Sequence, residues 1–154
     1  MNVEIQQKPA LRAAGLRHIG AYNRINEAFG RLGDIAGRAG LFNHPGAAMI
    51  AIYYDDPEST PVDELRSAAA IVVPEKLQIP DGLTEHRLPA GRYACATHVG
   101  PYERLGDTWS KLMGEWIPAN NLRMAHGESY EVYLNDPSTT PKEELRTEIC
   151  VPVE

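Results

Sequence analysis

Hydrophobic residues follow two different periods along this chain, and each change of period marks a boundary between elements. Residues 10–19 and 92–99 are mostly apolar, and a glycine follows each stretch, a pattern that predicts a strand. The spacing then changes to the i, i+3, i+4 intervals of a helix with one buried stripe. The two stripes are Ile25, Ala28, Phe29, Leu32, Ile35, Ala36 and Ala39, and then Leu105, Trp109, Leu112, Met113 and Trp116. Gly40 and Pro118 are predicted to end these helices.

Two further apolar stretches follow each predicted helix. Residues 48–54 and 130–134 combine aromatic with branched side chains, which favours strands. Residues 68–73 and 147–151 predict one more strand in each half. With a short leading strand, the order in each half is strand, strand, helix, strand, strand.

The two halves are copies of one another, offset by 80 residues without a gap. Residues 18–24 match residues 98–104 at four of seven positions, and residues 53–66 match residues 133–146 at eight of 14. About one chance identity is expected over 14 residues at average composition. The sequence therefore contains a duplication.

This repeat predicts one domain over residues 1–154, made of repeat one (1–80) and repeat two (81–154). The fold class is α+β. The two repeats are expected to form one antiparallel sheet with the helices on one face. The other face then needs water or a partner, and a ligand groove is predicted there, across the seam between the repeats.

The repeated motifs carry a family resemblance. They are the His-x-Gly-x-Tyr segments that begin at His18 and His98, the strand 131–135, and the Asp-Pro-x-x-Thr-Pro-x-x-x-Leu-Arg turn that begins at Asp56 and Asp136. In this order, over essentially the whole chain, they resemble the GyrI-like family. That family includes DNA gyrase inhibitory proteins and the effector-binding domains of multidrug-sensing AraC-type and MerR-type regulators. The resemblance implies a small-molecule site in which a ligand-contacting glutamate corresponds to Glu131.

Positions at which the repeats differ are candidates for a one-sided binding site. Alanines at positions 51, 68 and 70 of the first repeat are matched by Glu131, Glu148 and Cys150 in the second. Period-two alternation predicts that these three side chains and Tyr133 point into the groove. A carboxylate beside tyrosine rings is a suitable receptor for a lipophilic cation. The predicted ligand-binding residues are Glu131, Tyr133, Glu148, Tyr53, Tyr102 and Trp116.

Structural roles compete with binding at several of these positions. The acids are equally well explained as solvent-facing groups on an open sheet, and Tyr102 and Trp116 as packing residues at the helix ends. Trp109, on the buried stripe, is predicted to belong to the core. His18 and His98 lack an acid or cysteine at ligand spacing. They are predicted to make structural hydrogen bonds at the strand-to-helix corner.

Charge and composition exclude several classes of protein. The net charge is −6, and lysine and arginine form no cluster, so no direct nucleic-acid binding is expected. No apolar run is long enough to span a membrane, and the first residues lack a basic region followed by an apolar run, so no signal peptide is expected. The two cysteines, Cys95 and Cys150, lack metal-ligand spacing, and a carboxylate beside Cys150 would suppress its thiolate. We therefore expect a cytoplasmic protein with no cofactor, no metal site and no catalytic cysteine.

These observations favour a stand-alone small-molecule-binding protein for bulky aromatic or cationic compounds, acting in drug or toxin resistance as a monomer or weak homodimer. No catalytic residue is required for that function. An enzyme is the first alternative, in which Glu131 and Glu148 share a proton and supply acid–base chemistry. For it, the resemblance implies hydrolysis of electrophilic, cyclopropane-containing natural products. The second alternative implied by the resemblance is a protein inhibitor of DNA gyrase.

Overall fold

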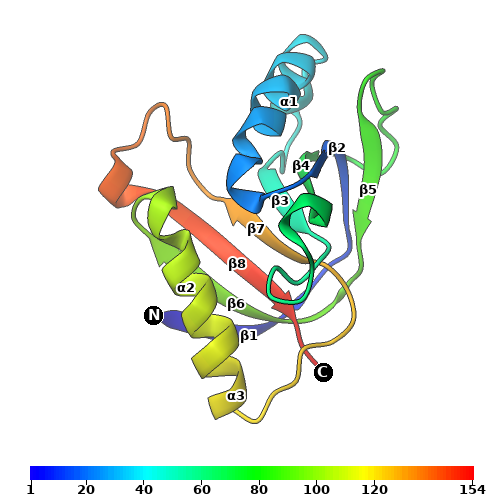
Figure 1. The fold of residues 1–154 in the computed structure, drawn as a ribbon. Helices are drawn as coiled ribbons and strands as arrows, with labels where there is room; N and C mark the ends of the chain where they lie inside the picture. Colours follow the sequence, from blue (N-terminus) through cyan, green and yellow to red (C-terminus); the bar gives the residue numbers. More distant parts are fainter. The chain divides into compact units, whose positions relative to one another are not determined.

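The computed structural model describes all 154 residues, which divide into two compact units (Figure 1). One unit is Ala10–Pro89; the other combines Met1–Pro9 with Ala90–Glu154. We call them the 10–89 unit and the 90–154 unit, the latter including residues 1–9. The predicted α+β class is confirmed, and so is the predicted order of strands and helix in each half.

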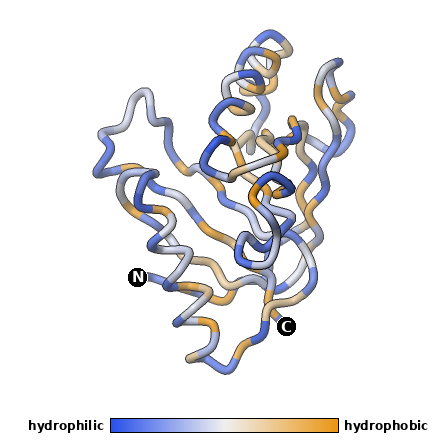
Figure 2. The backbone as a smooth tube through the Cα atoms, in the orientation of Figure 1, coloured by the Kyte–Doolittle hydropathy of each residue, from blue (hydrophilic) through white to orange (hydrophobic).

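In the 10–89 unit, the sheet has the strand order β3-β4-β2-β5 with antiparallel pairing. The strands are β2 (Leu11–Ile19), β3 (Met49–Tyr53), β4 (Arg66–Val72) and β5 (Thr84–Leu88). Helix α1 (Asn26–Arg38) packs on β2 and β4 and buries Ala28, Leu32 and Ala36. Hydrophobic and hydrophilic residues alternate around it (Figure 2), as its periodicity predicts. The helix ends before Gly40, which has a φ of +72°. Short 3₁₀ turns are η1 (Tyr22–Arg24), η2 (Leu41–Asn43) and η3 (Val62–Glu64).

The 90–154 unit repeats this arrangement with the strand order β1-β6-β8-β7. Its strands are β1 (Asn2–Lys8), β6 (Gly91–Val99), β7 (Ser129–Tyr133) and β8 (Arg146–Pro152). The helical segment consists of α2 (Leu105–Lys111), a π-helical turn η5 (Leu112–Trp116) and α3 (Ile117–Ala119). Pro118 was expected to end this helix, and the segment does end one residue later. The 3₁₀ turns are η4 (Tyr102–Arg104) and η6 (Lys142–Glu144).

The leading strands are exchanged between the two sequence copies. Strand β1 begins the first copy but pairs with β6 of the second, from Asn2 opposite Thr97 to Lys8 opposite Gly91. Strand β5 begins the second copy but pairs with β2 of the first. The compact units therefore do not coincide with the repeats 1–80 and 81–154 that self-comparison delimits.

A short proline link accounts for the exchange. Pro9-Ala10 joins β1 to β2, and Pro89-Ala90 joins β5 to β6. A two-residue hairpin needs positive φ at both of its central residues or a glycine at the first, whereas proline holds φ near −65°. Neither link can therefore fold its leading strand back onto the next strand in a tight hairpin, and the leading strand pairs elsewhere.

The histidines at the two strand-to-helix corners have the predicted structural role. The Nε2 atom of His18 donates to the Ala21 carbonyl oxygen at 3.0 Å, and Nε2 of His98 donates to the Pro101 carbonyl oxygen at the same distance. Two residues after each histidine lies a glycine with strongly positive φ. Its N–H donates at 2.8 Å to the carbonyl oxygen of the leucine that follows η3 or η6: Gly20 to Leu65, and Gly100 to Leu145. The two copies thus build the same corner.

Candidate functional site

The register of β7 against β8 decides which predicted site residues share a face. Glu131 lies opposite Ile149, and Val132 lies opposite Glu148. Residues directly opposite one another project to the same side of a sheet. Ile149 packs in a core with Leu105 and Leu112 of the helical segment, so Glu131 and Tyr133 lie on the helix side.

Glu148 and Cys150 therefore lie on the opposite side, and the expectation that all four side chains face one groove away from the helix is wrong. Alternation relates residues within one strand, but it does not relate two strands until their register is known. Glu131 and Glu148 belong to opposite faces of the same sheet and cannot share a proton. The acid–base pair proposed for a hydrolase is therefore not formed.

Glu131 is instead the centre of an aromatic cluster beneath the helix. Its side chain is only 3% exposed. The indole Nε1–H of Trp109, on α2, donates to Oε1 at 2.6 Å, and the hydroxyl of Tyr133 donates to Oε2 at 2.8 Å. Both oxygens thus accept hydrogen bonds from neutral groups, one from the helix and one from the strand. We call Glu131, Trp109, Tyr133 and Tyr102 the carboxylate–aromatic cluster.

Tyr102 extends this cluster at the start of the helical segment. Its ring centroid lies 5.3 Å from that of Tyr133, with the ring planes inclined by 58°. Burial raises the pKa of Tyr102, and the negative charges of Asp136 and Glu131 raise it further. The ring pair therefore lies in a negative potential that disfavours a second anion and favours a cation.

The corresponding tyrosines of the other copy, Tyr22 and Tyr53, also form a pair, with centroids 4.8 Å apart and an inclination of 54°. The Tyr22 hydroxyl donates to the Asp55 carbonyl oxygen at 2.7 Å. The paired rings are thus common to both copies, whereas position 51, which corresponds to Glu131, is an alanine in the first. For Tyr53, predicted as a ligand contact, the tyrosine pair provides a structural role.

Two other predicted contacts have separate surroundings. Trp116 lies in the π-helical turn and packs, partly buried, against the core beneath the helix. Glu148 accepts a hydrogen bond from Lys8 Nζ at 2.7 Å on the far side of the sheet, next to Cys95 and Cys150. These three acid and thiol groups are close enough to hold a metal ion, in contrast to the expectation of no metal site.

Trp109 is the site residue that the sequence analysis missed, because its position on the hydrophobic stripe indicated core packing. A signal was nevertheless present. Trp109 corresponds to Phe29 and Glu131 to Ala51, so a ring that can donate a hydrogen bond and a carboxylate that can accept it occur together in one copy and are both absent from the other.

Comparison with known proteins tests the resemblance. The model of the GyrI-like small-molecule-binding domain matches residues 1–154. The chain belongs to the GyrI-like family. A DNA gyrase inhibitor from Yersinia enterocolitica is 28% identical over 141 residues, which cover 88% of each chain. The family that the repeated motifs indicated is thus confirmed, and with it a small-molecule-binding domain.

Solved structures with this fold include a domain of a DNA-bound protein and a ligand-bound protein. The EcmrR C-terminal domain matches with a TM-score of 0.77 and 19% identity, over 99% of this chain and 97% of that one. In the EcmrR–DNA complex, the match covers 99% of this chain and 57% of the EcmrR chain. The structure of SAV2435 bound to tetraphenylphosphonium matches with a TM-score of 0.73 and 16% identity, over 100% and 94% of the two chains. At these identities the matches show a common fold.

None of the helices combines the length and the apolar character that crossing a bilayer requires.

Proposed function

We propose that this protein binds bulky lipophilic cations, with Glu131 as the counter-charge and the rings of Tyr102, Trp109 and Tyr133 around it. The observation that carries the proposal is a carboxylate with 3% exposure whose Trp109 and Tyr133 donors are both neutral. These donors hold the carboxylate in a fixed orientation among the aromatic rings. A carboxylate in such a low-dielectric setting attracts a cation more strongly than a carboxylate in water does.

The aromatic rings add selectivity for the same class of ligand. The face of an aromatic ring attracts a cation, and its apolar area binds the hydrophobic surface of the ligand. A family of small-molecule-binding domains and a neighbour bound to tetraphenylphosphonium, itself a lipophilic cation, support this choice. A protein of this kind would lower the free concentration of toxic cations, which is the resistance role that we infer for it.

A pair of probes with one shape and opposite charges tests the charge requirement. Tetraphenylphosphonium and tetraphenylborate both carry four phenyl rings around a central atom. In isothermal titration calorimetry the phosphonium should bind and the borate should not, because the borate would place an anion beside Glu131. Equal affinity for both probes would show that hydrophobic shape alone drives binding, and would contradict the proposal.

Substitution of the carboxylate locates the site. Glu131→Gln keeps the shape of the side chain and removes its charge, so phosphonium binding should weaken roughly ten- to a hundredfold, since hydrogen bonds and contacts to charged groups contribute about 1.5–3 kcal/mol. Glu143→Gln is the matched control, because it makes the same charge change on an exposed residue of η6. Its affinity should equal that of the wild type.

Tryptophan emission gives an independent readout of the same site. The chain has two tryptophans, so Trp116→Phe leaves Trp109 as the reporter. Phosphonium should change the Trp109 emission with the same dissociation constant that calorimetry gives. Calorimetric binding without any change in emission would mean that the ligand binds away from Glu131.

Inhibition of DNA gyrase is a second candidate function, favoured by the relative from Yersinia enterocolitica that bears that name. The test is plasmid supercoiling by purified gyrase in the presence of this protein. Inhibition by the wild type and equally by Glu131→Gln is expected, because a partner protein would contact the surface and Glu131 is buried. Undiminished supercoiling at a large molar excess of this protein would contradict the gyrase function and would leave the proposal for lipophilic cations unaffected.

A further inference from the structure

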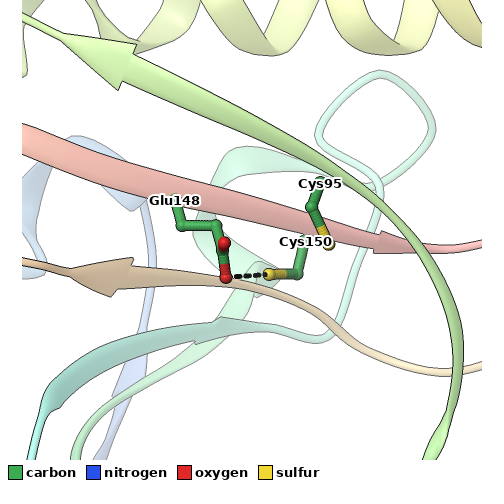
Figure 3. A group of neighbouring side chains, drawn as sticks. All are labelled: Cys95, Glu148 and Cys150. Atoms are coloured by element: carbon green, nitrogen blue, oxygen red, sulfur yellow. Dashed lines mark hydrogen bonds between the residues drawn. The ribbon is translucent and has the colours of Figure 1, made fainter. Parts of the chain in front are cut away.

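Two thiols and a carboxylate converge on the face of the 90–154 sheet opposite Glu131. Cys95 of β6 and Cys150 of β8 are directly opposite one another in register, and both thiols are free. Glu148 lies two residues before Cys150 on the same face, and the Cys150 thiol donates to its Oε1 at 3.3 Å (Figure 3). The two sulfur atoms and a carboxylate oxygen all lie within 4.8 Å of one another.

We propose that Cys95, Cys150 and Glu148 form a binding site for a thiophilic divalent cation of the zinc class. Thiolate sulfur and carboxylate oxygen are both ligands of tetrahedral zinc. With zinc–sulfur and zinc–oxygen bonds of about 2.3 and 2.0 Å, tetrahedral geometry separates two sulfur ligands by about 3.8 Å and a sulfur from an oxygen by about 3.5 Å. The donors therefore need to move only slightly, and water supplies the fourth ligand.

The first sequence copy provides an internal comparison, because every one of these positions is without a donor there. Positions 15, 68 and 70 correspond to Cys95, Glu148 and Cys150, and they are glycine, alanine and alanine. At Gly15 a Cβ atom would lie only 2.5 Å from the Ala69 carbonyl oxygen, so the first copy has no room for a side chain there. Three donors in one copy against none in the other indicate a site and not a general requirement of the fold.

Lys8 completes the charge balance of the site. Its Nζ lies 2.7 Å from Glu148 Oε1, and the matching position in the 10–89 unit, residue 88, is leucine. Two thiolates, one carboxylate and a divalent ion leave a net charge of −1, which the Lys8 ammonium neutralises. A neutral assembly is much less costly to bury than an unpaired charge.

The two thiols differ in how readily they lose a proton. A hydrogen bond with Cys150 lowers the pKa of Cys95, and Lys8 contributes in the same direction. The hydrogen bond with Cys95, together with burial, raises the pKa of Cys150. A metal ion replaces the thiol protons when it binds, so its affinity should increase with pH.

Access to the site is from the side of Glu148 and Lys8. Cys150 is fully buried and Cys95 nearly so, whereas the Glu148 and Lys8 side chains are 17% and 21% exposed. The buried thiols limit solvent access to the metal, whereas the side of Glu148 and Lys8 stays open to the water that supplies the fourth ligand. An entering ion meets the carboxylate first and reaches the thiols behind it.

The experiment uses the full chain, reduced and freed of metal by a chelator. Titration with Cd²⁺ should produce the thiolate-to-cadmium charge-transfer absorption in the ultraviolet and saturate at one ion per chain. An excess of Zn²⁺ should displace Cd²⁺ and bleach that absorption. The affinity for Zn²⁺ is measured separately, by competition with a chromogenic chelator, and Zn²⁺ binding to the apo protein should release protons. Binding without a thiolate band, or with millimolar affinity only, overturns the proposal.

Alanine substitutions remove one metal ligand at a time. At two of the three positions the other copy of the fold already contains alanine. Cys150→Ala and Glu148→Ala introduce the residues found at positions 70 and 68. Cys95→Ala and Cys150→Ala should each lower Zn²⁺ affinity at least about 100-fold, since loss of an outer-shell partner alone costs 10–100-fold. Glu143→Gln, an exposed acid of the same unit, is the control and should bind as the wild type does. Circular dichroism checks that each variant is folded.

The outcomes separate this site from the one proposed for lipophilic cations. Zn²⁺ should raise the melting temperature of the wild type and leave that of Cys95→Ala/Cys150→Ala unchanged. Phosphonium affinity should be the same in both proteins, because Glu131 is on the other face of the sheet. Equal Zn²⁺ affinity in the double variant and the wild type would rule the metal site out while leaving the cation site unaffected.

Discussion

At the scale of single residues, the distinguishing feature of this chain is a hydrogen bond that exists in one copy only. Trp109 and Glu131 are joined at 2.6 Å, whereas their counterparts in the first copy are Phe29 and Ala51. The sequence pattern placed the tryptophan in the core and the glutamate in a groove, and each assignment treated one residue alone. Their joint appearance was visible in the sequence, but only the register of β7 shows that the two side chains meet.

A double-mutant cycle measures how strongly these two residues are coupled. Trp109→Phe removes the indole donor of Glu131 Oε1, and Glu131→Ala removes the acceptor of two half-buried donors, so each change should cost about 1–3 kcal/mol of unfolding free energy. The double variant restores the pair found in the first copy. It should be less destabilised than the sum by about 0.5–3 kcal/mol, measured by urea unfolding. Strict additivity would mean that the hydrogen bond contributes nothing to stability.

At the scale of elements, the Asp-Pro turns show how two copies solve one problem with different chemistry. In the first copy, Asp55 Oδ2 accepts the backbone N–H of Arg66 at 2.8 Å; in the second, Asn135 Oδ1 accepts that of Arg146 at 2.9 Å. Asp55 also accepts from the Arg66 guanidinium, at 3.0 and 2.8 Å. This side-chain hydrogen bonding lowers the pKa of Asp55 below its ordinary value of 3.8. The backbone bond is thus common to both turns, and the ion pair belongs to one.

Substitution of Asp55 should make stability less dependent on pH. A carboxyl with a depressed folded-state pKa stabilises the protein above its unfolded-state pKa, and this stabilisation is lost as pH falls through the folded value. The wild type should therefore be more stable than Asp55→Asn at neutral pH. The difference should shrink below about pH 4. Unfolding midpoints in urea between pH 2 and pH 7 check this.

The reciprocal change in the other turn is the matched control. Asn135→Asp places a carboxylate beside Arg146 and should introduce, in the 90–154 unit, the acid-sensitive stabilisation that Asp55→Asn removes. A constant difference between Asp55→Asn and the wild type over the whole pH range would show that ionisation of Asp55 does not stabilise the fold.

At the scale of the whole molecule, the exchange of leading strands joins the two sequence copies. Strand β1 completes the sheet that contains β6 and brings Lys8 to Glu148, so a residue from the start of the chain takes part in the candidate metal site. Strand β2 is already flanked by β4 and β5, which leaves no edge for β1. The exchange therefore determines which residues can meet.

A disulfide tests this pairing directly. Asn2 lies opposite Thr97, so Asn2→Cys/Thr97→Cys in a chain without Cys95 and Cys150 should oxidise readily and migrate faster in a non-reducing gel. The bond should also raise the melting temperature, because it closes a long loop in the unfolded chain. Asn2→Cys/Arg17→Cys is the control: it would cross-link only if β1 formed a local hairpin with β2. Efficient cross-linking in the control, and not in the first pair, would contradict the exchange.

The sequence alone determined the features that depend on neighbouring residues or on comparison of the two halves. The duplication, the order of elements, the histidine corners and the family are of this kind, because hydrophobic period and local motifs are written into short segments. The tertiary structure alone decided which residues far apart in the chain come together. A shift of one residue in register turns a side chain to the other face, so no pattern within β7 or β8 could separate Glu131 from Glu148. The same non-local pairing carried β1 to β6 and set Cys95 opposite Cys150, which places the two candidate sites on the two faces of one sheet.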